Sequence, residues 1–271
     1  MHSQFLEDER VTRKLTCDVA DHFHQANLPY VLFGWQAIPL AGSRAITNEV
    51  GFVIPDAHMA AAINVLVAAG YDHCQDATCN ELKVDRVGPN NSDINMVISK
   101  NRYHSVPAAH FRFQPDNVYA LSLHLQSEVL WWLPDIQAGP PAANDAAFML
   151  SNDPRLPPCL DEGGSGPWLG VDDTPVKIMK INSLTEAVMW LWCQDSALRI
   201  LQVCWMAVLK ELEDEPEGRH TKVTKKLRPD FQYAWDCFSS AIRLTRLDGT
   251  GTLSCATSLQ RMDSSVLGLI P

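Results

Sequence analysis

The chain has 271 residues, with 22 Lys and Arg against 32 Asp and Glu, and a formal net charge of −10 at pH 7. Its 46% hydrophobic and 20% charged residues are typical of a globular protein and exclude a disordered or collagen-like chain. The negative charge opposes binding to phosphate backbones, so nucleic acid is not expected as a partner. The eight cysteines are scattered, without a Cys-x-x-Cys pair, which predicts reduced thiols rather than a zinc site.

Neither secretion nor membrane insertion is expected. The first ten residues carry charges where a signal peptide has an apolar stretch. The most apolar long stretch, residues 188–209, is interrupted by Gln194, Asp195 and Arg199, which are costly in a bilayer. We therefore expect a cytoplasmic protein that has no membrane partner.

Helical and β-type patterns alternate in the first half of the chain. Helical spacing of apolar residues, or a run ended by Gly or Pro, predicts helices over 5–27, 36–40 and 57–69. Short β-branched runs predict strands over 30–33, 49–54, 82–87 and 94–98, the last two as a hairpin. The segment 118–133 begins with strict alternation, which predicts a half-buried strand with Ser122, His124 and Gln126 on one face.

The second half of the chain differs in character. Residues 139–174 are rich in Pro, Gly and Asp, which predicts a long excursion or linker. Long helical patterns follow over 183–194, 197–213 and 230–247, and Ser183 with Glu186 forms a candidate capping box. These patterns divide the chain into an α/β domain (1–138), an excursion or linker (139–175) and a helical region (176–271).

The run from Phe33 to Ile54 resembles the nucleotidyltransferase superfamily, with its polymerase-β-like fold, and most of all its small aminoglycoside-modifying and fungal branches. The residues that match its pattern, together with a later candidate carboxylate, are Gly34, Arg44, Thr47, Glu49 and Asp93. The resemblance covers residues 28–100 well and the later helices loosely. It implies an α+β fold: a nucleotidyltransferase-like mixed sheet flanked by helices, followed by a C-terminal helical region that completes the cleft.

Two departures from that pattern fall on its chemical elements. Nucleotidyl transfer needs carboxylates at positions i and i+2 of one strand, where they share a face and hold divalent cations. Here Glu49 is followed at i+2 by Gly51, which offers no ligand, and Trp35 replaces the second glycine of the phosphate-binding turn. The sequence also lacks dinucleotide-binding, P-loop and nucleophile-elbow motifs. We expect neither a metal nor a cofactor.

These observations predict an acid/base enzyme that acts on a small aromatic or apolar metabolite in natural-product biosynthesis. A cyclase or isomerase is the concrete form, for example an intramolecular addition of a hydroxyl to an alkene that closes an oxygen ring. The expected catalytic residues are Glu49, Asp93 and His124. The expected substrate-binding residues are Trp35, Arg44, Thr47, Asn95, Ser122 and Gln126.

Two other functions stay open. A divergent, metal-dependent nucleotidyltransferase that modifies a small molecule would need another metal ligand, such as Asp85 or Asn95. A non-catalytic binding protein would have Trp35 packed into a filled cleft. Glu49 alternatively pairs with Arg44 at the surface, and His124 is alternatively a solvated or structural histidine.

Overall fold

The structure is a computed structural model that describes residues 2–43, 49–76, 79, 106–113, 119–158, 166–170, 173–194, 199–213, 227–229, 231–236 and 239. The chain divides into two compact units, residues 1–180 and residues 181–271. The first unit holds the sheet and the second is helical, which confirms the expected α+β class.

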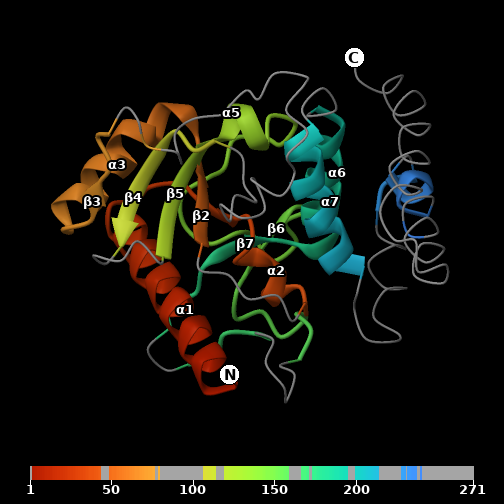
Figure 1. The fold of residues 1–271 in the computed structure, drawn as a ribbon, viewed down its shortest axis with the longest axis horizontal. Coiled ribbons are helices and arrows are strands. Elements are labelled where there is room, and N and C mark those ends of the chain that lie inside the picture. The colour runs from red at the N-terminus through yellow and green to blue at the C-terminus, as the bar shows by residue number, and fades with distance from the viewer. Residues whose placement is uncertain are drawn as a thin grey trace. The chain divides into compact units, whose positions relative to one another are not determined.

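Seven strands in the described part of the first unit form one mixed sheet, in the order β3-β4-β5-β2-β1-β7-β6 (Figure 1). The strands are β1 (Val31–Phe33), β2 (Glu49–Ile54), β3 (Asp72–His73), β4 (Ala109–Phe113), β5 (Tyr119–Leu125), β6 (Phe148–Leu150) and β7 (Lys177–Met179). β2 is parallel to β5 and β1 is parallel to β7, whereas the other neighbours are antiparallel. Strands β3, β4, β6 and β7 were not predicted from the sequence.

The described helices of this unit are α1 (His2–Gln25), α2 (Ala37–Leu40), the 3-10 turn η1 (Asp56–His58), α3 (Met59–Ala68) and α5 (Gln126–Val129). Apolar residues at four-residue spacing give α1 one buried side, formed by Leu15, Val19 and Phe23. The Phe23 ring meets the Phe52 ring of β2 edge-on, with centroids 5.6 Å apart. Burying each of these rings contributes roughly 2–3 kcal/mol of stability, so this contact holds α1 against the sheet.

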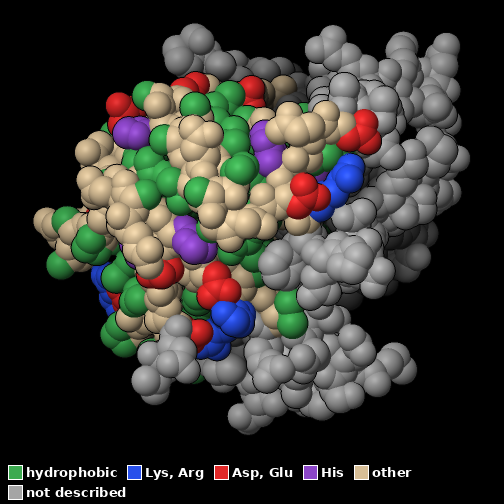
Figure 2. Space-filling view, turned by 90° about the vertical axis from the view of Figure 1, so that its left-hand side faces the viewer, with side chains coloured by type: hydrophobic (Ala, Val, Ile, Leu, Met, Phe, Trp, Pro, Cys, Tyr) green, Lys and Arg blue, Asp and Glu red, His purple; other side chains and the backbone are tan. Residues whose placement is uncertain are grey.

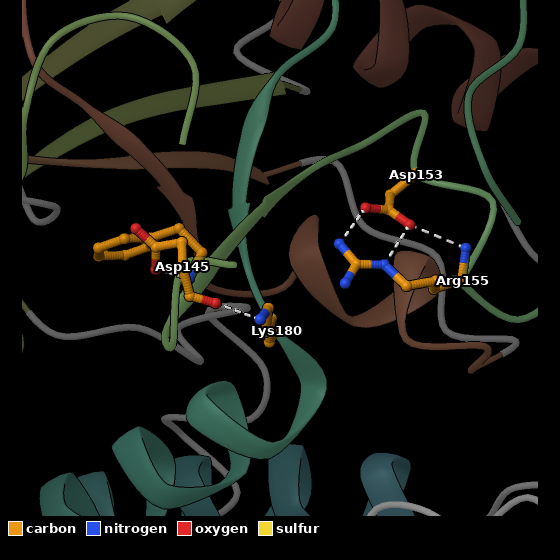
Figure 3. A network of polar contacts seen from close by, with 5 residues as sticks. Asp145, Asp153, Arg155 and Lys180 are labelled. Atoms are coloured by element: carbon orange, nitrogen blue, oxygen red, sulfur yellow. Dashed lines mark hydrogen bonds and ion pairs between the residues drawn. The ribbon is translucent and has the colours of Figure 1, made fainter. Parts of the chain in front are cut away.

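Residues 145–155 lie within the predicted excursion or linker and contain a strand that was not predicted, the edge strand β6, between two tight turns (Figure 3). Before the strand, Asp145 accepts hydrogen bonds from two backbone amides at 2.8 Å, and its carbonyl accepts one from Lys180. After the strand, Asp153 binds the Arg155 side chain and backbone amide. Because these local bonds close the turns, a segment rich in turn residues still adds a strand to the sheet.

The second unit contains α6 (Ile181–Gln194), α7 (Arg199–Glu213) and helical residues 231–236. The capping-box prediction was wrong. α6 begins at Ile181, before Ser183, and the Glu186 carboxylate instead accepts hydrogen bonds from the backbone and side chain of Arg228, at 2.8 and 2.9 Å. The predicted strands 82–87 and 94–98, and most of the predicted helix 230–247, lie outside the described residues.

The described helices include none with the length and apolarity needed to cross a bilayer. On the face of the molecule shown in Figure 2, the basic side chains lie next to acidic ones.

Candidate functional site

Strands β2 and β5 place a set of polar side chains on one face of the sheet. In their parallel register Gly51 lies opposite Ser122 and Val53 opposite His124, so these residues and Glu49 point to the same side. β4 adds His110, which pairs with Ser122. We call the four side chains of Glu49, His110, Ser122 and His124 the polar sheet face. All four are buried, with 8%, 6%, 0% and 2% of their surface exposed.

The imidazole of His124 lies beside Gly51. A Cβ atom at position 51 would lie 3.6 Å from His124 Nε2 and only 3.0 Å from the carbonyl oxygen of Phe33. The Phe33 ring meets the imidazole edge-on, with centroids 6.3 Å apart. The imidazole therefore lies at the level of residue 51, two positions from Glu49 along β2, which is roughly 7 Å. In the nucleotidyltransferase pattern that the sequence resembles, the second carboxylate belongs to position 51.

The hydroxyl of Ser122 lies at the centre of this face. Its Oγ is fully buried and has no hydrogen-bond partner in the described part of the chain. A buried polar group without a partner costs about 1–3 kcal/mol, and such groups mark places where a ligand or water completes the bonding. Ser122 is thus well placed to donate to a polar atom of a bound molecule.

Trp35 follows the end of β1, the strand that pairs with β2. Gly34 follows β1 with a positive φ of 79°, and the antiparallel register pairs the last residue of β1, Phe33, with Gly51 near the start of β2. The Trp35 carbonyl accepts the amide of Ile38 at 3.2 Å in the turn that leads into α2. The indole is half-buried, so it belongs neither wholly to the core nor to the open surface.

Gln126 does not share the face of His124, contrary to the prediction. The strand ends at Leu125, and Gln126 begins the short helix α5. Its side-chain amide donates to the carbonyls of Leu133 and Pro134, and its oxygen accepts the amide of Ile136. These bonds give Gln126 a structural role in fixing the loop 133–136. The strand itself is buried on both faces rather than half-buried.

The other predicted site residues, Arg44, Thr47, Asp93 and Asn95, lie outside the described residues, as does Asp85. Within the described ranges, no group of three or more His, Cys, Asp or Glu side chains is arranged to hold a metal ion.

His110 was missed in the sequence analysis, although a signal for it exists. Residues 109–113 alternate between Phe and the polar residues His110 and Arg112, as expected for a strand with one polar side. The alternation does not show that His110 pairs with Ser122, because this pairing depends on the register between β4 and β5.

No family model matches this chain, and neither the curated proteins nor the solved structures contain a match. The resemblance to nucleotidyltransferases therefore stays a prediction.

Proposed function

We propose that this protein is an acid/base enzyme that isomerises a small organic molecule, with Glu49 and His124 as the pair that transfers protons. The observation that carries the proposal is the imidazole of His124 at the level of Gly51, on the buried face that also holds Glu49. A carboxyl group and an imidazole are the side chains that most often exchange protons with substrates.

The imidazole of His124 beside the i+2 position, Gly51, supports proton transfer over nucleotidyl transfer. A pair of carboxylates there would bind divalent cations, whereas an imidazole changes its charge near neutral pH and exchanges protons readily. Ser122, which pairs with His110 on one side and Gly51 on the other, supplies a hydroxyl that orients a substrate oxygen. The chain thus offers a donor, an acceptor and an orienting group on one face.

An aromatic or largely apolar substrate suits this proposal, because the Phe33 ring contacts His124 of the polar sheet face and the half-buried Trp35 follows the same strand. In a ring closure, an acid protonates one alkene carbon, the substrate hydroxyl oxygen bonds to the other, and a base takes the hydroxyl proton. No atom is gained or lost, so the product is an isomer of the substrate. We assign Asp93, Arg44, Thr47 and Asn95 to the same site, and place the enzyme in the cytoplasm.

Thermal unfolding with candidate ligands tests the proposal, since a ligand that binds only the native state raises the melting temperature. We would compare ATP with Mg²⁺, GTP with Mg²⁺, and prenylated aromatic polyketides. An aromatic compound that stabilises the protein is then incubated with it, and the products are searched for an isomer of equal mass.

Isomer formation that is lost in Glu49→Gln and His124→Gln, but kept in the exposed-histidine control His58→Gln, supports the proposal. Stabilisation by nucleotide with Mg²⁺ alone would instead indicate a nucleotidyltransferase. Stabilisation by an aromatic compound without turnover would indicate a binding protein.

A further inference from the structure

A second feature, separate from the polar sheet face, is a pocket of about 640 Å³ at the ends of β2 and β5. Pro55 and Asp56 follow the last residue of β2, and Gln126 and Ser127 follow the last residue of β5. Crevices outside the carboxyl ends of neighbouring parallel strands are common ligand sites in α/β sheets. The volume is in the range of small-molecule pockets.

The charged lining of this pocket is acidic. Asp56 and Asp135 contribute carboxylates, His58 contributes an imidazole, and the lining residues that the structure describes include no Lys or Arg. The ammonium of Lys177 donates to the carbonyl of Gln137, which belongs to the pocket wall, but Lys177 is itself buried and is not among the lining residues. The described lining therefore favours a positively charged ligand.

Asp56 is held in a fixed orientation. One of its carboxylate oxygens accepts the backbone amide of Ser127 at 3.1 Å, and the other accepts the Ser127 hydroxyl at 2.6 Å. These hydrogen bonds lower the pKa of Asp56, because they stabilise the charged form. Each carboxylate oxygen has a further lone pair, so an oriented negative charge is available to a ligand.

An aromatic ring completes the lining. Trp131 is 41% exposed, an unusual degree for an indole, and its ring meets that of Trp132 edge-on with centroids 4.4 Å apart. The face of an indole attracts cations, most strongly those with a diffuse, weakly hydrated charge. A tryptophan together with carboxylates suits an organic ammonium ion better than Ca²⁺ or Mg²⁺, which prefer oxygen ligands alone.

We propose that this pocket binds an organic ammonium ion, with its charge beside Asp56 and Asp135 and its alkyl groups against Trp131. The ligand class follows from the aromatic and acidic lining, not from the acid/base chemistry proposed for Glu49 and His124. The ammonium pocket and the acid/base function can therefore each be disproved without affecting the other.

Calorimetric titration of the full chain with choline tests this proposal. The matched probe is the neutral alcohol in which a tert-butyl group replaces the trimethylammonium group, because it has the same shape without the charge. We expect choline to bind and the neutral alcohol to bind at least about fivefold more weakly. Added salt should weaken choline binding and leave binding of the alcohol unchanged.

Three variants locate the site. Asp135→Asn and Trp131→Ala should each weaken choline binding by about fivefold or more. Asp56→Asn should also weaken choline binding. Because this variant loses hydrogen bonds to Ser127 and can therefore fold poorly, Asp135→Asn provides an independent test of the acidic lining. Asp153→Asn, which removes a carboxylate outside the pocket, should have no effect on choline binding.

The proposal is overturned if choline fails to bind, if the neutral alcohol binds equally well, or if the pocket variants leave choline binding unchanged. It is also overturned if inorganic phosphate binds the pocket, because an anion site is incompatible with this lining. Glu49→Gln should not change choline binding, which separates this test from that of the proposed function.

Discussion

Gly51 and His124 are complementary across β2 and β5: the imidazole Nε2 lies 3.6 Å from the place where a Cβ of residue 51 would be. A single Cβ there would contact the imidazole at an ordinary van der Waals distance, whereas a side chain larger than that of Ala would compete with the present rotamer of His124 for one space. Gly51, which offers no metal ligand, thus leaves the space beyond a Cβ to the imidazole.

This competition predicts the effect of enlarging residue 51. Gly51→Ala should be destabilising, because its Cβ would meet the Phe33 carbonyl oxygen at 3.0 Å. Gly51→Val should lower the free energy of unfolding further, by about 1–3 kcal/mol in total, since it also crowds the imidazole. Urea unfolding measures both values. If His124→Ala does not restore part of the loss in Gly51→Val, the proposed competition is wrong.

Two buried serines form a matched pair for a second prediction. Ser122 and Ser151 are both 0% exposed, but only the Ser151 hydroxyl has a described partner, the amide of Val176 at 3.0 Å. Ser151→Ala should cost about 1–3 kcal/mol, because it leaves that buried amide unpaired. Ser122→Ala should leave the stability of the ligand-free protein unchanged or raise it. The melting temperatures of both variants, measured by thermal unfolding, test this difference. Equal destabilisation of the two variants would contradict the prediction.

The Tyr30 hydroxyl lies 2.8 Å from His24 Nε2, which predicts a pH dependence of stability. Burial raises the pKa of Tyr30, so the hydroxyl stays protonated and donates to the imidazole. Burial lowers the pKa of His24 below its ordinary 6.5, so the fold favours the neutral ring. This contribution to stability is complete above about pH 6.5 and is lost as the pH falls through the lowered value.

Urea unfolding at several pH values measures this loss. His24→Gln should reduce the fall in stability below about pH 6.5, whereas the exposed-histidine control His58→Gln should keep it. If the free energy of unfolding of His24→Gln falls with pH as steeply as that of the wild type, His24 is not the group whose titration causes the fall.

Gln126 offers a fourth prediction, based on the three hydrogen bonds of its side chain. Gln126→Leu should lower the free energy of unfolding by about 2–4 kcal/mol, because the amide of Ile136 and two carbonyls lose their partner. Hydrogen exchange at Ile136 should accelerate more than at Phe148, which Asp145 holds independently. The control Gln137→Leu removes one exposed local bond and should have little effect.

The sequence predicts those elements whose pattern is local. β2 has the predicted limits because a β-branched run is ended by Pro55, and α1 follows from the spacing of Leu15, Val19 and Phe23. β6 and β7 are only three residues long and depend on pairing with distant partners, so no local pattern marks them.

The candidate site shows the same division. Alternation correctly places Ser122 and His124 on one face, but it also predicts Gln126 there. The strand ends earlier because the Gln126 amide binds a loop several residues further on, which alternation does not encode. The contribution of His110 likewise depends on the register between β4 and β5.

The pairing of Leu32 with Ile178 has a consequence for synthesis of the chain on the ribosome. β1 is among the first strands made, yet its outer edge stays uncovered until β7 has emerged. An uncovered strand edge invites pairing with other chains. Nascent chains that stall before β7 should therefore aggregate or recruit chaperones, whereas those that stall after the β7 segment has left the exit tunnel should not.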